Sequence, residues 1–228
     1  MKVRLRMKIP KIEKMQIAYN RVKRDSKISY IVIHDTQNKS KGADALAHFK
    51  YFNSGNRNSS ADFFVDDKRI LQINDYKIYN TWHVGDGKGK YGVTNKNSIG
   101  IEICVNSDGD YKSAFKNAVW LTKMLIRELS IPIENVIRHY DASKKICPAS
   151  MSGNNWEKWE EFKSMLKEND MGKFNDIGDN FAKKDIEELY EMGIISGVTE
   201  TEFKPDEVAT RAQIARVARN IIRYITGE

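Results

Sequence analysis

The sequence predicts an α/β domain, with a mixed central sheet flanked by helices, followed by a small helical C-terminal domain. Up to about residue 170, short β-branched runs alternate with longer segments of helical periodicity. Beyond that point only helical spacing recurs. A chain of 228 residues that is 40% hydrophobic is long enough to bury a real core. We expect domains at residues 1–170 and 171–228, with a basic N-terminal arm over about residues 1–27.

The strands of the first domain are predicted from apolar runs bounded by polar residues. Residues 28–36, "ISYIVIHDT", read as a buried strand, and residues 60–74 read as a hairpin that turns at Asp66-Asp67-Lys68. Residues 97–104 form another strand, and a short one is expected near residues 135–137. Because side chains alternate along a strand, the 97–104 strand has two faces: Ile99, Ile101 and Ile103 on one, Gly100, Glu102 and Cys104 on the other.

Helices are predicted where apolar residues recur every three or four positions. The clearest example covers residues 110–130 and ends at Ser130-Ile131-Pro132. Helices are also expected over residues 41–54 and 154–169, and in the second domain over residues 182–193 and 210–225. Two helices bury little core by themselves, so we expect the second domain to need a partner surface or self-association.

The charge distribution favours an anionic partner. The formal net charge is +7, but residues 171–228 carry 8 basic and 11 acidic side chains, and most of the excess lies before Ser29. A basic body suits nucleic acid, a membrane surface or an acidic wall polymer. We expect no nucleic-acid partner, because basic and aromatic residues do not interleave in a stripe. A solvated basic arm is the alternative interpretation of the N-terminal charges.

We expect neither an export signal nor a membrane-spanning segment in this chain. No run approaches the roughly 18 apolar residues that a membrane span needs. The first residues, "MKVRLRMKIPKIEKMQ", contain no apolar stretch of a secretory signal peptide. We therefore expect synthesis in the cytoplasm without a signal peptide.

The segment "IRHYDASKKICPAS" places seven residues between His139 and Cys147. A catalytic zinc takes three protein ligands and keeps one position open, and His34, at the end of a predicted strand, offers a third. A structural pair and a disulfide between Cys147 and Cys104 are the alternatives.

Glu102 lies in the middle of the strand "SIGIEICV". A buried carboxylate without a partner costs several kcal/mol, and metal hydrolases use a carboxylate to take a proton from water. A strand face open to solvent, or a salt bridge, would explain Glu102 equally well.

Several motifs in order resemble one family, the zinc-dependent type-2 N-acetylmuramoyl-L-alanine amidases with the peptidoglycan-recognition-like fold. The chain looks most like phage and prophage endolysins of Gram-positive bacteria. The resemblance covers about residues 28–166 and rests on "YIVIHDT", "KGADALAHFKYF", "SADFFVDDKRILQI", "TWHVGDGKG", "NSIGIEICVNSDGDY", "NAVWLTKMLIRELSI" and "NVIRHYDASKKICP".

This resemblance implies a zinc ion held by His34, His139 and Cys147. It implies hydrolysis of the amide between N-acetylmuramic acid and L-alanine in peptidoglycan, with zinc binding the water and polarising the carbonyl. Glu102 would pass the water's proton to the leaving amine, and Lys145 would stabilise the oxyanion. One more solvated lysine is the alternative for Lys145.

Other residues are assigned with the same resemblance in view. His83 of "TWHVGDG" matches a residue that lines the substrate groove, with a purely loop-holding histidine as the alternative. His48 is expected to be an ordinary helix histidine and Cys104 a packed thiol.

The sequence departs from the family at two places. Close relatives carry an aromatic–histidine pair where this chain has Ala61-Asp62, which we expect to alter groove contacts. They commonly read Ser-Gly-Lys where this chain has Ser143-Lys144-Lys145.

The tail resembles a single S-layer homology repeat, through "FNDI", "GIISG", "FKP" and "TRAQ". Such repeats hold anionic secondary wall polymers, and Arg211 matches the arginine whose planar fork suits a carboxylate. Gln213 replaces the usual glutamate. Because the family usually carries three repeats, we expect a homo-oligomer through this domain.

Two other functions stay open: a peptidoglycan-recognition module without catalysis, and a zinc peptidase that cuts stem-peptide bonds. If the chain is an amidase, we expect an endolysin or autolysin that acts on the wall after holin-type release or lysis.

Overall fold

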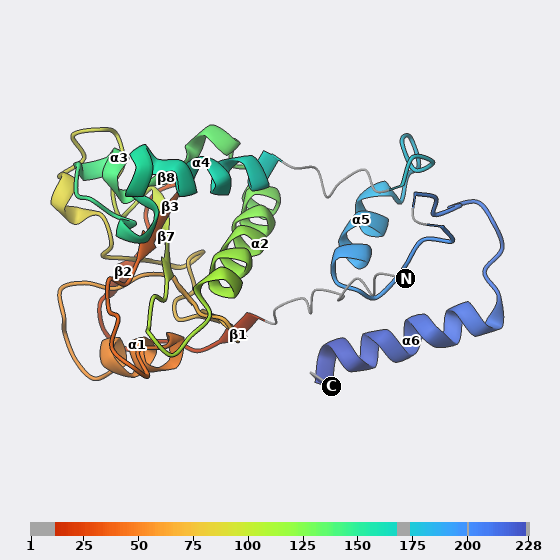
Figure 1. The fold of residues 1–228 in the computed structure, drawn as a ribbon, viewed down its shortest axis with the longest axis horizontal. Coiled ribbons are helices and arrows are strands. Elements are labelled where there is room, and N and C mark those ends of the chain that lie inside the picture. The colour runs from red at the N-terminus through yellow and green to blue at the C-terminus, as the bar shows by residue number, and fades with distance from the viewer. Residues whose placement is uncertain (1–11, 168–173, 200, 227–228) are drawn as a thin grey trace. The chain divides into compact units, whose positions relative to one another are not determined.

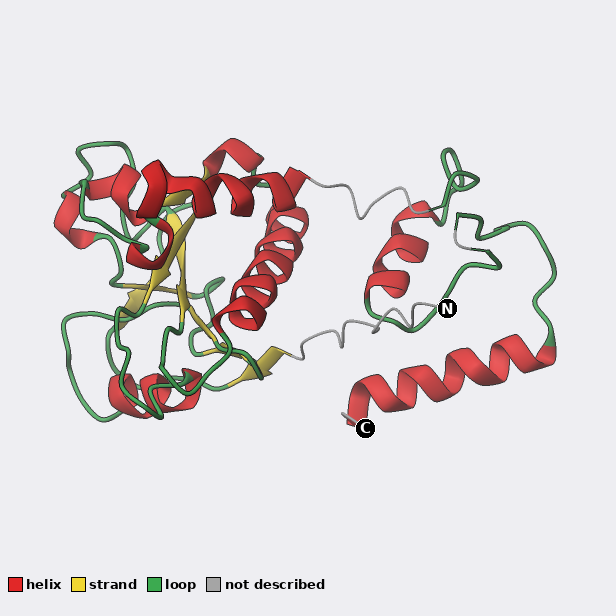
Figure 2. Cartoon of the chain, in the orientation of Figure 1, coloured by secondary structure: helices red, strands yellow, loops and turns green. Residues whose placement is uncertain are grey.

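A computed structural model describes residues 12–167, 174–199 and 201–226 of the chain. The residues divide into two compact units (Figure 1). The N-terminal unit spans residues 12–167, and the described part of the C-terminal unit spans residues 174–199 and 201–226. Strands occur only in the first of these described parts, as Figure 2 shows.

The N-terminal unit is built on a six-stranded mixed sheet with the order β1-β5-β4-β7-β3-β8. All neighbours run parallel except β4 and β5, which form the predicted hairpin. A separate antiparallel pair joins β2 to β6. The strands are β1 (Ile12–Lys14), β2 (Arg21–Lys23), β3 (Tyr30–Asp35), β4 (Phe63–Val65), β5 (Ile70–Gln72), β6 (Tyr79–Thr81), β7 (Ser98–Ile103) and β8 (Val136–Arg138).

Helices cover both faces of this sheet. Against one face pack α2 (Tyr111–Leu129) and α4 (Gly153–Lys167), which share a core with Ile99, Ile101 and Ile103 of β7. Helix α1 (Ala45–Asn53) packs on the other face with Phe64 and Cys104. The two-faced alternation predicted for β7 is therefore confirmed. The remaining helical segments are α3 (His139–Ser143) and the short 3₁₀ turns η1 (Gly85–Gly87), η2 (Ile133–Asn135) and η3 (Ala149–Met151).

Local signals in the sequence set the ends of the helices. The side chains of Asp44 and Asp110 accept hydrogen bonds from the first turns of α1 and α2, at 2.8 and 3.1 Å. Ser130, in the left-handed region, ends α2 where the sequence predicts. In the β4–β5 turn, Asp66 Oδ1 accepts from the backbone N–H groups of Lys68 and Arg69, which fixes the hairpin.

The expectation of a solvated basic arm is wrong for residues 12–27. Strand β1 pairs with β5, and β2 pairs with β6, so two stretches of this segment belong to the sheets of the N-terminal unit. The Arg24 guanidinium donates to the backbone carbonyl of Tyr76 at 2.7 Å, to that of Ser98 at 3.0 Å, and to that of Lys96. Short strands with many charged residues gave no clear period, which is why the sequence did not reveal them. The rest of the predicted arm, residues 1–11, lies outside the described residues.

The C-terminal unit contains the two predicted helices, α5 (Lys183–Glu191) and α6 (Arg211–Thr226). A small core of Phe174, Ile177 and Ile186 packs with neighbours that include Tyr190 and Phe203. Within the described residues of α6, none is buried, and Ile214, Ile221 and Ile222 are 59%, 39% and 49% exposed. The unit thus leaves an apolar helix face uncovered within the part of the chain that the structure describes.

Gln213, in the first turn of α6, makes a capping interaction that the usual glutamate could also make. Its Oε1 accepts from the backbone N–H of Thr210 at 2.7 Å, and the Thr210 hydroxyl accepts from the Gln213 N–H at 3.2 Å. This reciprocal capping box works with either glutamine or glutamate.

None of the helices in the described residues combines the length and the apolarity needed to cross a bilayer.

We predict that Arg24→Ala lowers the free energy of unfolding of the N-terminal unit by about 3 kcal/mol, because hydrogen bonds from a charged donor to three carbonyls are lost. Arg24→Lys should recover little, since one ammonium cannot reach all three carbonyls. Urea unfolding followed by circular dichroism measures the change. Lys23→Ala, an exposed neighbour, is the control and should stay within about 0.5 kcal/mol of the wild type. Equal stability of the Arg24→Ala and Lys23→Ala variants would contradict the assignment.

Candidate active site

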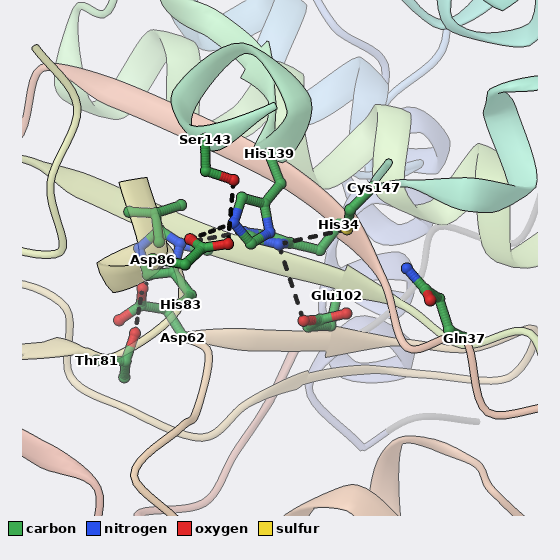
Figure 3. A network of polar contacts seen from close by, with 12 residues as sticks. His34, Gln37, Asp62, Thr81, His83, Asp86, Glu102, His139, Ser143 and Cys147 are labelled. Carbon is green, nitrogen blue, oxygen red and sulfur yellow. Dashed lines mark hydrogen bonds and ion pairs between the residues drawn. The ribbon is translucent and has the colours of Figure 1, made fainter. Parts of the chain in front are cut away.

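The site begins where two central strands run side by side. Strands β3 and β7 are parallel, and their register sets His34 opposite Glu102. Both side chains therefore leave the same face of the sheet, the face opposite α2 and α4. The His34 Nδ1 atom lies 4.0 Å from the Glu102 Oε1 atom (Figure 3).

The segment after β8 brings the other two predicted ligands to this point. His139 is the first residue of α3, and the chain then turns so that the Tyr140 N–H donates to the Cys147 carbonyl at 3.0 Å. Cys147 Sγ lies 3.7 Å from His34 Nδ1. One potential ligand atom from each of His34, His139 and Cys147 lies within 4.8 Å of the others, and all three side chains are buried.

Two buried polar atoms at this point lack protein partners. Neither His139 Nδ1 nor Glu102 Oε2 has a hydrogen-bond partner in the described part of the chain. Buried polar atoms without a hydrogen-bond partner are rare in folded proteins, so a bound ion, ligand or water is a reasonable explanation for each. A divalent cation between two imidazole nitrogens and a sulfur would satisfy the first, and the donor set of two nitrogens and one sulfur suits zinc.

The protonation of the ligands also fits a cation. Burial lowers the pKa of His34 well below its usual value and lowers that of His139, so both rings are neutral and can donate a lone pair. Burial raises the pKa of the Cys147 thiol. A neutral buried thiol becomes a thiolate when a metal ion supplies compensating charge.

Both cysteines are free thiols, so the alternative of a Cys104–Cys147 disulfide is wrong in this structure. Cys104 packs with Phe64 and Ala45 under α1, as the packed-thiol interpretation predicts.

Glu102 differs from a surface carboxylate in both its exposure and its pKa. Its side chain is 20% exposed. Burial and, to a smaller extent, the nearby charge of Asp35 raise the pKa of Glu102 to about 8, while Lys145 opposes the shift. A strand face open to solvent does not describe this residue.

A pocket of about 510 Å³ lies beside the candidate metal ligands. Lys145 is exposed and contributes to its wall, next to His139. The residues that line it are Asn58, Ser59, Trp82, His83, Gly85, Asp86, Asn95, His139 and Lys145.

His83 is buried to 8% exposure although it lines this pocket. Its Nδ1 lies 3.1 Å from His34 Nε2, and its Nε2 lies 3.1 Å from Ser98 Oγ. Burial, with the neighbouring His139 and Arg24, lowers the pKa of His83 to about 3. Since both ring nitrogens have protein partners, the geometry favours the holding role over the predicted substrate contact through a ring nitrogen.

Asp86 is a residue of this site that the sequence reasoning missed. Its Oδ1 lies 2.8 Å from His139 Nε2, and its Oδ2 accepts from the Ser143 hydroxyl at 3.1 Å (Figure 3). Its position three residues after His83 was visible in "HVGDG", but an aspartate in a glycine-rich loop is common in plain turns.

The two departures from the family pattern have local effects. Ala61 and Asp62 are fully buried, and the expected change in groove contacts stays a prediction. Asp62 accepts hydrogen bonds from the Gly100 N–H, the Thr81 hydroxyl and the Asn74 amide. Lys144 has φ = 69° at the end of α3. Glycine would suit this left-handed position better by about 1 kcal/mol.

The remaining predicted residues lie elsewhere. His48 stacks on Phe64 at 5.0 Å between ring centroids, as a packed helix histidine. Arg211 is the first residue of α6, in the C-terminal unit, and is exposed.

Comparison with known proteins gives matches for both units. Residues 24–150 match the family described as N-acetylmuramoyl-L-alanine amidase, and residues 173–215 match the S-layer homology domain. The chain is similar to the N-acetylmuramoyl-L-alanine amidase CwlH of Bacillus subtilis strain 168, at 44% identity over 126 residues, which is 54% of this chain and 48% of CwlH. It is 42% identical to XlyA of the same strain over 138 residues, 59% of this chain and 43% of XlyA. The matched region thus spans about half the length of these relatives or less.

Solved structures similar to the chain include a mutant endolysin from Bacillus subtilis and the catalytic domain of XlyA. The first has 41% identity and a TM-score of 0.62, covering 69% of this chain and 99% of that chain. The second has 38% identity and a TM-score of 0.58, covering 68% and 99%. The predicted mixed α/β architecture is confirmed by these similarities. Since the family match covers more than half of the sequence, the chain belongs to the N-acetylmuramoyl-L-alanine amidase family.

Proposed function

We propose that this protein is a zinc-dependent peptidoglycan amidase that hydrolyses the amide between N-acetylmuramic acid and L-alanine. The observation that carries the proposal is the cluster of His34, His139 and Cys147 with Glu102 beside it and a pocket alongside. The family match supports the choice of bond. The similarity to endolysin catalytic domains supports a lytic role as endolysin or autolysin.

In this proposal His34, His139 and Cys147 would hold one zinc ion. When bound, zinc supplies Lewis-acid chemistry, polarising a carbonyl and making water more acidic. Glu102 accepts the proton of the attacking water and returns it to the leaving amine. Its raised pKa of about 8 matches it to proton transfer near neutral pH. Lys145, exposed at the pocket wall, offers a positive charge where the oxyanion develops.

The first test pairs metal content with the bond that is cut. We expect one zinc ion per purified chain by mass spectrometry of the metal. We also expect new N-terminal L-alanine when Gram-positive peptidoglycan is digested and the free amines are labelled. Bound zinc with a different new amine would move the reaction to a stem-peptide bond. Wall binding without zinc and without any new amine would make the chain a recognition module.

Glu102→Gln serves as the matched variant in this experiment. Glutamine keeps the shape of the side chain but cannot accept a proton, so we expect zinc to remain bound while the rate falls by about 10²–10⁴-fold. Release of L-alanine at near wild-type rate by this variant would show that Glu102 is not the base.

For the C-terminal unit we propose wall targeting, through an anionic secondary wall polymer bound with the help of Arg211. The S-layer homology match of residues 173–215 and the exposed guanidinium at the start of α6 support this role.

Removal of residues 171–228 should leave cleavage of soluble peptidoglycan fragments unchanged and weaken binding to whole walls. Arg211→Ala in the full chain should reduce wall binding without an effect on fragment cleavage. Cosedimentation with purified walls measures the binding, and Arg223→Ala on the same helix is the control. Equal wall binding by the full and the shortened chains would contradict the targeting role.

We further propose that α6 associates with the same helix of other copies of the chain. Its exposed Ile214, Ile221 and Ile222 form an apolar face. The small core around Phe174 does not include them. Light scattering at micromolar concentration should give a mass above that of one chain, and Ile221→Asp should return it to the monomer. A monomeric wild-type mass would contradict self-association.

A further inference from the structure

The hydrogen bonds of His34 have only one consistent direction. His34 contacts His83, His83 contacts Ser98, and Ser98 contacts Thr94. In the last of these contacts the Ser98 hydroxyl donates to the Thr94 carbonyl at 2.5 Å, because a carbonyl oxygen can only accept. The Ser98 oxygen must therefore accept from His83 Nε2–H, at 3.1 Å. The neutral His83 ring then has an acceptor at Nδ1, which receives the His34 Nε2–H at 3.1 Å. This leaves the lone pair of His34 on Nδ1, the atom that faces Cys147.

The second ligand histidine is fixed in the same way by a carboxylate. Asp86 Oδ1 accepts from His139 Nε2–H at 2.8 Å, and Asp86 Oδ2 accepts from Ser143. The lone pair of His139 is thus on Nδ1, the atom without a partner in the described residues. Both rings therefore keep the lone pair on Nδ1, and both are held by their Nε2 atoms.

Both partners come from one short segment between β6 and β7. His83 and Asp86 are three residues apart, on either side of the start of η1. Asn95 holds the segment by accepting from the backbone N–H groups of His83, at 2.9 Å, and Val84, at 2.8 Å. A single loop conformation thus sets the position of both side chains.

Two glycines allow this loop to approach so closely. A Cβ atom on Gly100 would lie 2.7 Å from His83 Cγ, so only glycine in β7 leaves room for the imidazole ring. A Cβ atom on Gly87 would lie 2.3 Å from the Ala142 carbonyl oxygen, so glycine lets η1 close against α3, where His139 lies. Each glycine thus sets the place of one partner of the candidate ligand histidines.

We propose that His83 and Asp86 are positioning residues that together align both candidate metal-ligand histidines, each with Nδ1 toward the ion. The inference rests on the metal site of the proposed function and does not depend on which bond is cut. Partners of this kind orient the ring and raise the basicity of the ligand, and losing one typically weakens metal binding by about 10–100-fold. In this proposal His83 acts through His34, and its predicted contact with substrate stays a prediction.

The test measures zinc affinity of the full chain by competition with a chromogenic chelator at fixed pH. We expect His83→Leu and Asp86→Ala each to weaken zinc binding by about 10–100-fold. His83→Asn, whose amide oxygen can stand where Nδ1 stood, should recover most of the loss. The melting temperature of each metal-free variant, compared with that of the metal-free wild type, separates lost alignment from lost folding.

Matched controls remove the same groups away from the site. Asp25→Ala deletes an exposed carboxylate that pairs with Lys96, and His48→Leu deletes the imidazole stacked on Phe64. Both should bind zinc as the wild type does. Replacing zinc by Co²⁺ adds a spectroscopic readout, in which the thiolate charge-transfer band should shift or weaken in His83→Leu and Asp86→Ala but not in the controls.

Two failures can be told apart. A wild-type chain that binds no zinc would contradict the proposed function. A wild-type chain that binds zinc, with His83→Leu and Asp86→Ala binding equally tightly, would overturn the positioning role alone. If His83→Leu does not fold, His83→Asn and Asp86→Ala still decide the matter, because full affinity in Asp86→Ala or a 100-fold loss in His83→Asn would contradict the inference.

Discussion

The parallel pairing of β3 with β7 is the constraint on which the site depends. Its register sets His34 opposite Glu102 and aligns the ends of both strands at one edge of the sheet. A shift of one residue would send one of these side chains into the core that α2 and α4 share with β7. The three isoleucines of β7 prevent that shift, because their burial fixes which face carries the carboxylate. Hydrophobic packing on one face of the sheet thus places the chemistry on the other.

Much of this could be predicted from the sequence where the signals were local. The period of α2, the alternation in β7 and the turn at Asp66 follow from side-chain patterning, and all three appear in the structure. The grouping of His34, His139 and Cys147 came from the family resemblance and the chemistry of the residues. The strand ends and the loop after β8 bring these side chains together, and the role of each remains a proposal.

The parts that escaped prediction depend on contacts between distant segments. Strands β1 and β2 have only three residues each and gain their definition from β5 and β6, which follow much later in the chain. Asp86 can contact His139 only because Gly87 lets the loop of Asp86 approach α3. Asp62 was only a departure from the family motif in the sequence, and its burial and its hydrogen bond with the Gly100 N–H became apparent only in three dimensions. In each case the deciding partner is far away in sequence, where no local period can reveal it.

The spread of the ligands along the chain has a consequence for the order of folding. His34 and Cys147 are separated by 113 positions, and β8, which leads to His139, docks at the outer edge of β3. Closing so long a loop costs entropy that only late, non-local packing repays. A chain that has assembled β3 to β7 without β8 would hold one imidazole and one carboxylate but no complete coordination set. An ion would then bind the finished sheet in preference to its precursors, and its binding energy would add to the stability of the native state by mass action.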